Sequence, residues 1–282
     1  MSRSLTTLLT VFAMLAFAGN SLLCRLALKD TDIDAASFTV VRLASGALVL
    51  WLIVVYRRKD RTQSAGSWSS AIALFIYAAG FSYAYIGLTA GTGALLLFGA
   101  VQATMITYGL WTGERLTTRQ TLGLLLALTG LLGLLLPGLS APPLRGSLLM
   151  LLAGFAWGVY SLRGAGAGDP TAVTAGNFLR ATPLALGLSI VTLPWISIDP
   201  DGLWYAVASG ALASGMGYAI WYTALRGLRA TSAATVQLSV PVIAALGGIP
   251  FLGEPVTVRL LLASLAVLGG IALVVVERRA RR

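Results

Sequence analysis

The chain has 282 residues, of which 57% are hydrophobic and only 11% are charged. A soluble domain needs more charged side chains to cover its surface, so this composition predicts an integral membrane protein. The net charge of +10 lies mostly in loops between apolar segments, which argues against nucleic-acid binding. Histidine is absent and Cys24 is the only cysteine, which excludes an internal disulfide, a zinc site and a histidine-based triad.

Charged, proline-containing or turn-like breaks divide the chain into about ten apolar segments. Each is close to the roughly 20 residues that a helix needs to cross a bilayer, and none alternates like a barrel strand. The first segment contains a loose signal-peptide pattern at Ala16-Phe17-Ala18, but it continues to Leu28 and has a partner later in the chain, so we expect it to remain in the fold. The expected spans are 5–28, 35–56, 68–88, 92–112, 118–137, 144–164, 171–194, 202–225, 230–252 and 257–276.

The distribution of Lys and Arg predicts the orientation of these spans. An even number of spans puts both ends of the chain on one side, and most basic residues fall on that side: Arg3, Arg57, Arg58, Lys59, Arg61, Arg115, Arg119, Arg163, Arg226, Arg229, Arg278, Arg279, Arg281 and Arg282. The other side receives Lys29, Arg145 and Arg259, together with acidic residues. Because cytoplasmic loops carry the excess of positive charge, both termini are predicted to be cytoplasmic, in a multi-pass protein of a bacterial inner membrane.

An internal repeat divides the chain into halves at 1–138 and 139–282. A Gly-Glu turn followed by Thr and Arg occurs at 113–119 and again at 253–259, and a glycine follows each copy at the same distance, at Gly130 and Gly270. Further matches at a nearly constant offset are Phe17-Ala18 with Phe155-Ala156, Arg25 with Arg163, and Arg42 with Arg180. Such self-similarity indicates duplication.

With about five spans in each half, an odd number, the second half enters the membrane upside down. The predicted fold is therefore all-α, with ten transmembrane helices in two five-helix inverted repeats. Inverted repeats of this kind are a recurring basis of secondary transporters, in which two equivalent halves expose a central site to each side in turn. The repeat thus favours transport by alternating access.

These features resemble the drug/metabolite transporter superfamily, specifically its EamA-type members. The resemblance rests on the five-plus-five layout, the doubled Gly-Glu motif at Glu114 and Glu254, and Pro241 within the ninth span. It covers the whole chain, and the single-chain form is most similar to amino-acid exporters of the YddG type. The resemblance implies export of small metabolites, with amino acids, including aromatic ones, as the expected substrates.

Ionisable residues within spans are costly and therefore candidates for function. Arg42 and Arg180 lie about two turns into their helices, where they can snorkel, cap a helix or contact a substrate carboxylate. No Asp or Glu lies in the middle of a predicted span. A proton-coupled exporter of lipophilic cations needs such a carboxylate, so the sequence favours passive or exchange transport of a zwitterionic or neutral solute. Proton antiport of other metabolites or drugs is the alternative.

Amphipathic side chains at mid-span depth predict a hydrated central cavity. The third and eighth expected spans carry polar and aromatic residues at helical spacing, and other spans add single groups. Each aromatic taken alone is also compatible with ordinary packing. The candidate substrate-binding residues are Asn20, Tyr77, Phe81, Tyr108, Trp157, Tyr160, Tyr218, Trp221 and Gln237, with Arg42 and Arg180 as charged candidates.

Two other readings are possible. A membrane enzyme needs a constellation of catalytic side chains, and only the widely separated Glu114 and Glu254 are available, so no catalytic residue is expected. A structural subunit would bury its polar groups without leaving a cavity. We expect a small-molecule substrate and the lipid bilayer as partners, and no cofactor, metal or nucleic acid. The sequence leaves the oligomeric state open, and a monomer is compatible with it.

Overall fold

The computed structural model describes residues 2–57, 65–113, 115–138, 141–164, 169–228, 233 and 236–280, with side chains up to residue 275. All regular elements in these ranges are helices, which confirms the predicted all-helical class. They are α1 (Arg3–Asp30), α2 (Ala35–Arg57), α3 (Trp68–Tyr85), α4 (Ala90–Trp111), α5 (Thr118–Leu135), α6 (Leu144–Gly164), α7 (Pro170–Val191), η1 (Leu193–Trp195), α8 (Pro200–Val207), η2 (Ala208–Met216), α9 (Gly217–Leu225), α11 (Ser239–Leu252) and α12 (Val258–Ala280).

The helix bounds agree with the expected spans to within a few residues, except that much of the first part of 230–252 lies outside the described residues. Within the described ranges, six helices are long and apolar enough to cross a membrane: α1, α2, α4, α5, α6 and α12. The other expected spans are α3, α7, α11 and the segment α8–η2–α9. Many of the polar and aromatic residues that enter the central cavity belong to α3, α7 and α8–η2–α9, as described below.

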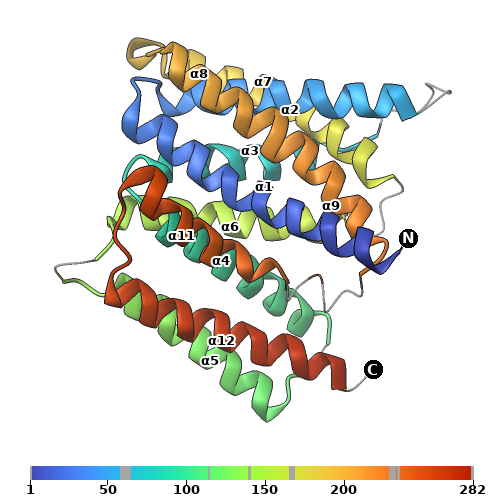
Figure 1. Cartoon of the computed structure of the whole chain (residues 1–282), viewed down its shortest axis with the longest axis vertical. Helices are drawn as coiled ribbons and strands as arrows, with labels where there is room; N and C mark the ends of the chain where they lie inside the picture. Colours follow the sequence, from blue (N-terminus) through green and yellow to red (C-terminus); the bar gives the residue numbers. More distant parts are fainter. Residues whose placement is uncertain are drawn as a thin grey trace.

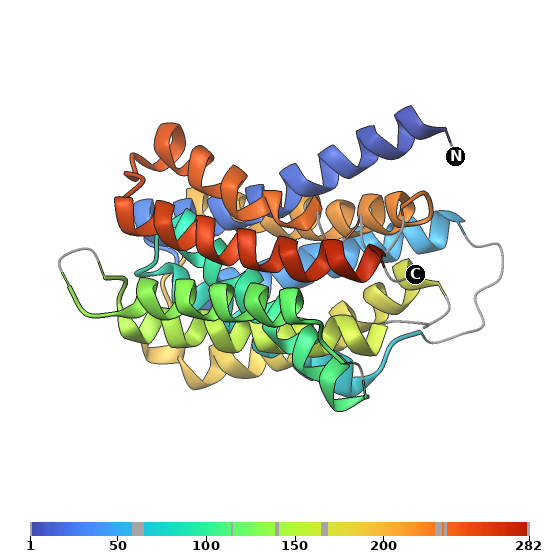
Figure 2. The same cartoon turned by 90° about the horizontal axis from the view of Figure 1, so that it is seen from below.

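The helices form one bundle, with the start of α1 and the end of α12 at the same end (Figure 1). We call this the terminal end and the other the distal end. Packing is equivalent in the two halves, since α3 packs on α6 while α8, η2 and α9 pack on α1. Likewise α4 packs on α6 and α11 packs on α1, and the matched helices α2 and α7 contact each other. Figure 2 shows α5 and α12 side by side.

The repeated Gly-Glu motif is explained by local backbone geometry. Gly113 and Gly253 both have positive φ, 94° and 62°, a conformation that glycine adopts without steric cost. The following threonines cap the next helix in both copies, because Thr117 Oγ1 accepts from the Gln120 N–H and Thr257 Oγ1 from the Leu260 N–H. Each copy of the motif therefore encodes a sharp turn and a new helix start. Glu114 lies outside the described residues.

Helices α5 and α12 approach each other closely through glycine. A Cβ added to Gly123 would lie 2.6 Å from the Gly270 carbonyl oxygen, and one added to Gly270 would lie 2.3 Å from the Gly123 carbonyl oxygen. In a lipid environment such small residues allow van der Waals contact between helix backbones, which drives helix association. The glycine at the end of the second repeat motif thus joins the last helices of the two halves.

This contact predicts that the variant Gly270→Ala is less stable by about 1–3 kcal/mol, because a methyl group would force the two backbones apart. Thermal unfolding in detergent measures the effect. The matched control is Gly269→Ala on the same helix, where an added Cβ meets no atom within 4 Å. Equal melting temperatures for the two variants would contradict the close contact.

Candidate functional site

A cavity of about 490 Å³ lies at the centre of the bundle. Its walls come from both halves, since residues of α1, α3 and α4 line it together with residues of α6, α7, η2 and α9. It extends from mid-bundle towards the terminal end, where it reaches the last residue of α6 (Gly164), the first of α7 (Pro170) and the last of α9 (Leu225). The volume is within the range of small-molecule binding sites.

Eight of the residues predicted as substrate-binding candidates line this one cavity. They are Asn20, Tyr77, Phe81, Trp157, Tyr160, Tyr218, Trp221 and Gln237. Tyr108 is different: it lies one helical turn past Met105, the last α4 residue of the wall, and 45% of its surface is exposed. The structure thus places Tyr108 one turn outside the wall of this cavity.

Trp157 is the centre of an aromatic cluster that connects the two halves. Its ring stacks on Tyr160 and on Tyr218, both with centroids 5.2 Å apart, and lies 4.8 Å from the Tyr77 ring of the first half. Tyr218 in turn contacts Phe17 of α1 at 5.6 Å. Such contacts contribute about 0.5–1.5 kcal/mol per pair beyond buried area. The cluster gives the cavity rigid, flat walls suited to an apolar or aromatic group.

Arg42 lies beside the cavity but is not part of its wall. Its side chain is 1% exposed, and its guanidinium lies 4.7 Å from the Phe81 ring centroid and 5.2 Å from that of Tyr77. Arg42 Nη2 donates to the Tyr77 hydroxyl at 2.9 Å, and Nε donates to Ser214 Oγ at 3.5 Å. The third nitrogen, Nη1, is buried without a hydrogen-bond partner. A full positive charge therefore lies directly behind two cavity-lining hydroxyls.

Asn20 of α1 extends this polar cluster. Its Nδ2 donates to the Tyr77 hydroxyl at 3.5 Å, and its Oδ1 accepts from Ser209 Oγ at 2.6 Å. Ser209 and Ser214 belong to η2, a nine-residue π-helix. Gly210 allows η2 to reach α2, since a Cβ there would lie 2.1 Å from the Arg42 carbonyl oxygen. The widened helix and its glycine bring the serines to Arg42 and Asn20, in keeping with the frequent placement of π segments at functional sites.

A second polar cluster lies on the α6–α7–α9 side of the cavity. Asn177 Nδ2 donates to the Tyr160 hydroxyl at 3.4 Å, which donates to Thr174 Oγ1 at 3.4 Å. Thr174 in turn donates to the Tyr222 hydroxyl at 3.3 Å. All these groups are neutral. They give the terminal half of the cavity hydroxyls and amides that can act as donors or acceptors.

Arg180, the repeat partner of Arg42, lies outside the cavity wall. Its Nη1 donates to the carbonyl oxygens of Ala65 and Gly176, both at 2.9 Å, which holds the segment before α3 against α7. The repeat thus contains two matched arginines with different surroundings. Arg180 has the helix-to-loop contacts of a structural residue, whereas Arg42 is buried among cavity residues.

Sequence reasoning missed several wall residues. Gln102 of α4, and Thr174 and Asn177 of α7, line the cavity but were not among the candidates. Asn177 is an amide inside an apolar run, one turn before Arg180, so its depth was a usable signal. No comparable signal in the sequence indicated the π-helix η2. None of the described wall residues is charged, and no cluster of three potential metal-ligating side chains occurs among the residues that the structure describes.

The distal end of the bundle is closed by an ion pair and its hydrogen bonds. Arg25 Nε of α1 lies 2.8 Å from Glu254 Oε1, in the turn between α11 and α12. Arg25 Nη1 also donates to the carbonyl oxygens of Tyr85 and Ile86 at the end of α3, and Glu254 Oε2 accepts from the Ala90 N–H at the start of α4. We call these groups the distal lock. It ties α1, the α3–α4 turn and the α11–α12 turn together.

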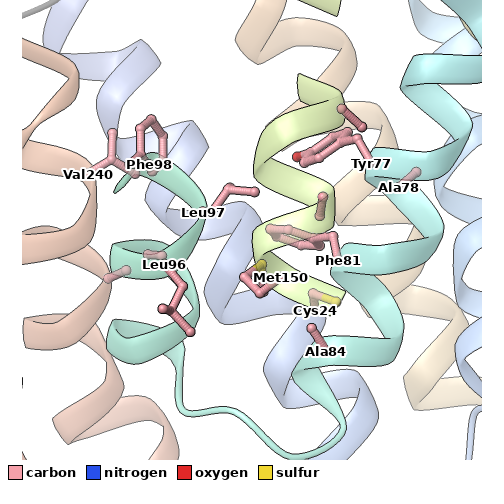
Figure 3. Packing of buried hydrophobic residues seen from close by; sticks show 14 of the residues in the cluster. Cys24, Tyr77, Ala78, Phe81, Ala84, Leu96, Leu97, Phe98, Met150 and Val240 are labelled. Atoms are coloured by element: carbon pink, nitrogen blue, oxygen red, sulfur yellow. The ribbon is translucent and has the colours of Figure 1, made fainter. Parts of the chain in front are cut away.

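Apolar packing fills the space between the lock and the cavity. Figure 3 shows Cys24, Phe81, Ala84 and Met150 gathered between α1, α3 and α6. All four side chains are buried, and only Phe81 also lines the cavity. The cavity is therefore sealed towards the distal end by this apolar layer and then by the distal lock.

Several known proteins are similar in sequence to this chain over most of its length. A protein of Pseudomonas aeruginosa, named only as uncharacterised, is 63% identical over 276 residues, which cover 98% of this chain and 96% of that protein. An uncharacterised transporter of Archaeoglobus fulgidus is 28% identical over 86% of this chain and 88% of its own, and the uncharacterised transporter YoaV of Bacillus subtilis is 24% identical over 85% and 87%.

The fold also has a solved counterpart. A crystal structure that covers 99% of both chains superposes with a TM-score of 0.69 at 19% identity, which shows likeness of fold alone. The model of the EamA-like transporter family matches this chain twice, over residues 4–136 and 144–276, and so accounts for the internal repeat. This chain, with its two tandem copies around one central cavity, belongs to the EamA-like transporter family.

Proposed function

We propose that the protein is a secondary carrier of small metabolites, with amino acids, including aromatic ones, as substrates, and that it works by alternating access. The observation that carries the proposal is the central cavity, which reaches the terminal end and is sealed at the distal end. A carrier that exposes its site to one side at a time needs this asymmetry. Flat aromatic walls with neutral polar groups fit an amphipathic solute.

The proposed topology is ten spans in two inverted five-helix repeats, with the terminal end in the cytoplasm of a bacterial cell. It is supported by the excess of Arg and Lys at that end and by the equivalent packing of the two halves. In this orientation the cavity faces the cytoplasm, and the distal lock closes the outer side. Export then requires the lock to open while the terminal end closes.

Proton antiport of other metabolites or drugs, cationic drugs among them, is the alternative. It requires a carboxylate that holds proton and drug in turn. Because the described cavity walls contain no Asp or Glu, nothing in them favours this mechanism. The positive charge of Arg42 next to the cavity opposes it further, since a cationic drug would be repelled.

The transport proposal is tested in proteoliposomes with radiolabelled phenylalanine, with and without proton or sodium gradients. We expect saturable uptake without any ion gradient. The variant Trp157→Ala should lower uptake about tenfold, because it removes a flat indole wall, and one lost aromatic contact with the substrate is worth up to about 1.4 kcal/mol of binding. The matched control is Tyr108→Ala, an aromatic outside the cavity wall, which should transport like the native protein. No uptake of any amino acid under any gradient would refute the proposed substrate class.

The lock proposal is tested through Cys24, which is fully buried next to Arg25 and is the only cysteine. The variant Glu254→Gln leaves Arg25 without a counter-charge, and a cost of about 1.4 kcal/mol to the closed state raises the open population about tenfold. We therefore expect a membrane-impermeant maleimide, added from the periplasmic side, to label Cys24 about tenfold faster than in the native protein.

The control for this experiment is Asp32→Asn, which removes an exposed carboxylate from the same end of the bundle without touching the lock. Its Cys24 should react as slowly as that of the native protein. If Glu254→Gln and Asp32→Asn give equal labelling rates, the ion pair does not hold the distal end closed.

A further inference from the structure

We propose that the part of the cavity next to Arg42 is a carboxylate-binding site, and that the protein recognises the carboxylate of its substrate without requiring an amino group. This inference rests on the proposed transport function. It defines the substrate class as small organic acids with an apolar body. Amino acids are then one subset of the substrates, together with related acids that lack the amine.

The first support is the unbalanced charge of Arg42. Its guanidinium is almost fully buried. Among the described residues no Asp or Glu side chain forms an ion pair with Arg42, and the carboxylates of Glu254 and Asp30 pair with Arg25 and Lys29. Its remaining contacts are the hydroxyls of Tyr77 and Ser214 and the face of Phe81, and Nη1 has none. A buried charge without a counter-ion is costly, and an anion brought to this place would reduce the cost.

The second support is the direction of the hydrogen bonds around Arg42. The Tyr77 oxygen accepts from both Arg42 Nη2 and Asn20 Nδ2, so its own proton remains to be donated. Ser214 Oγ likewise accepts from Arg42 Nε and keeps its proton. Asn20 Nδ2 has a second N–H beyond the one given to Tyr77. All three residues line the cavity. This part of the wall therefore presents hydrogen-bond donors, as an anion requires.

The third support is that the described cavity wall offers no charged partner to a substrate ammonium group. A substrate ammonium binds well to a carboxylate, but the described wall residues include no Asp or Glu. Near Arg42 it would be repelled. Away from Arg42 it would meet neutral hydroxyls and amides such as those of Thr174 and Asn177, which bind uncharged polar groups as readily. The structure thus offers charge complementarity to the carboxylate end of an amino acid alone.

In this arrangement Arg42 is a positioning residue. The carboxylate would contact Tyr77, Ser214 and Asn20 directly, while the guanidinium behind them orients and polarises the two hydroxyls. Hydrogen bonds in which one partner is charged are about twice as strong as neutral ones, which favours the carboxylate over its neutral amide. The apolar body of the substrate would then lie against Trp157 and Tyr218.

Binding to the purified full-length protein in detergent tests the inference. Three probes with the same aromatic body are compared by calorimetric titration: phenylalanine, phenylpyruvate, which lacks the amine, and phenylalaninamide, which lacks the carboxylate. We expect similar affinities for the two acids, within about threefold, and at least about tenfold weaker binding of the amide. Equal binding of phenylalaninamide, failure of phenylpyruvate where phenylalanine binds, or no binding of any probe would each overturn the inference.

Variants test whether the preference for acids over the amide comes from Arg42 and the hydroxyls next to it. Tyr77→Phe keeps the ring but removes the donated proton, so we expect it to weaken binding of both acids about tenfold and to leave the amide unchanged. Tyr83→Phe, which removes a hydroxyl from the same helix outside the cavity wall, is the matched control and should keep the preference for acids. Arg42→Gln, where it folds, should abolish the preference. If Tyr77→Phe keeps the preference of the native protein, the acid binds elsewhere.

Failure of this inference is distinguishable from failure of the carrier proposal. Acid-selective binding in detergent without transport in proteoliposomes would support the site and refute the carrier. Transport of phenylalaninamide as fast as phenylalanine would support the carrier and refute the carboxylate site.

Discussion

A polar group inside a bilayer costs free energy unless it finds a partner or water, and this constraint organises the bundle. Apolar side chains such as Leu122, Leu132 and Leu265 occupy the exposed surfaces of α5 and α12. The polar groups of α1, α3, α7 and η2 turn inward and pair with one another around the cavity. Arg42 is the extreme case, because at 1% exposure it is the most deeply buried of the described Arg, Lys, Asp and Glu side chains. Its burial would be hard to explain in a subunit that only packs against others.

The two ends of the bundle are held by different forces. At the distal end, the Arg25–Glu254 ion pair and its hydrogen bonds tie α1 to the α3–α4 turn and the α11–α12 turn over an apolar layer. At the terminal end, Arg163 Nε of α6 donates to Ser70 Oγ of α3 at 3.3 Å, and Arg163 is the repeat partner of Arg25. Matched arginines thus have an acidic partner at one end and a serine hydroxyl at the other. This difference between equivalent positions is what a two-state carrier would exchange during transport.

Much of the fold could be predicted from the sequence, because helix length and apolar runs are local properties. The repeated motif could be found as well, since Gly113, Gly253, Thr117 and Thr257 are fixed by turn and cap geometry. Depth within a span also identified eight residues that the structure brings together in the wall of one cavity. Tyr108 stands apart from these eight, because it lies one turn past Met105, the last α4 residue of the wall.

Other features depend on contacts between distant segments. Arg42 with Tyr77, and Arg25 with Glu254, are pairs whose partners lie far apart in the sequence, and periodicity within one helix does not contain that information. The π-helix η2 follows from its packing against α2, where Gly210 lies on the Arg42 backbone. Arg42 and Arg180 are matched in the repeat, yet Arg42 is buried beside the cavity while Arg180 donates to the carbonyl oxygens of Ala65 and Gly176.

Alternating exposure of the cavity is the central claim, and one measurement addresses it directly. A single cysteine introduced by Ser214→Cys, in a chain that also carries Cys24→Ala, is treated with a membrane-impermeant maleimide in membrane vesicles of either orientation. Alternating access predicts labelling from both sides, each slowed by a bound substrate, because position 214 lines the central cavity. Labelling from one side only, or from neither, would contradict the account.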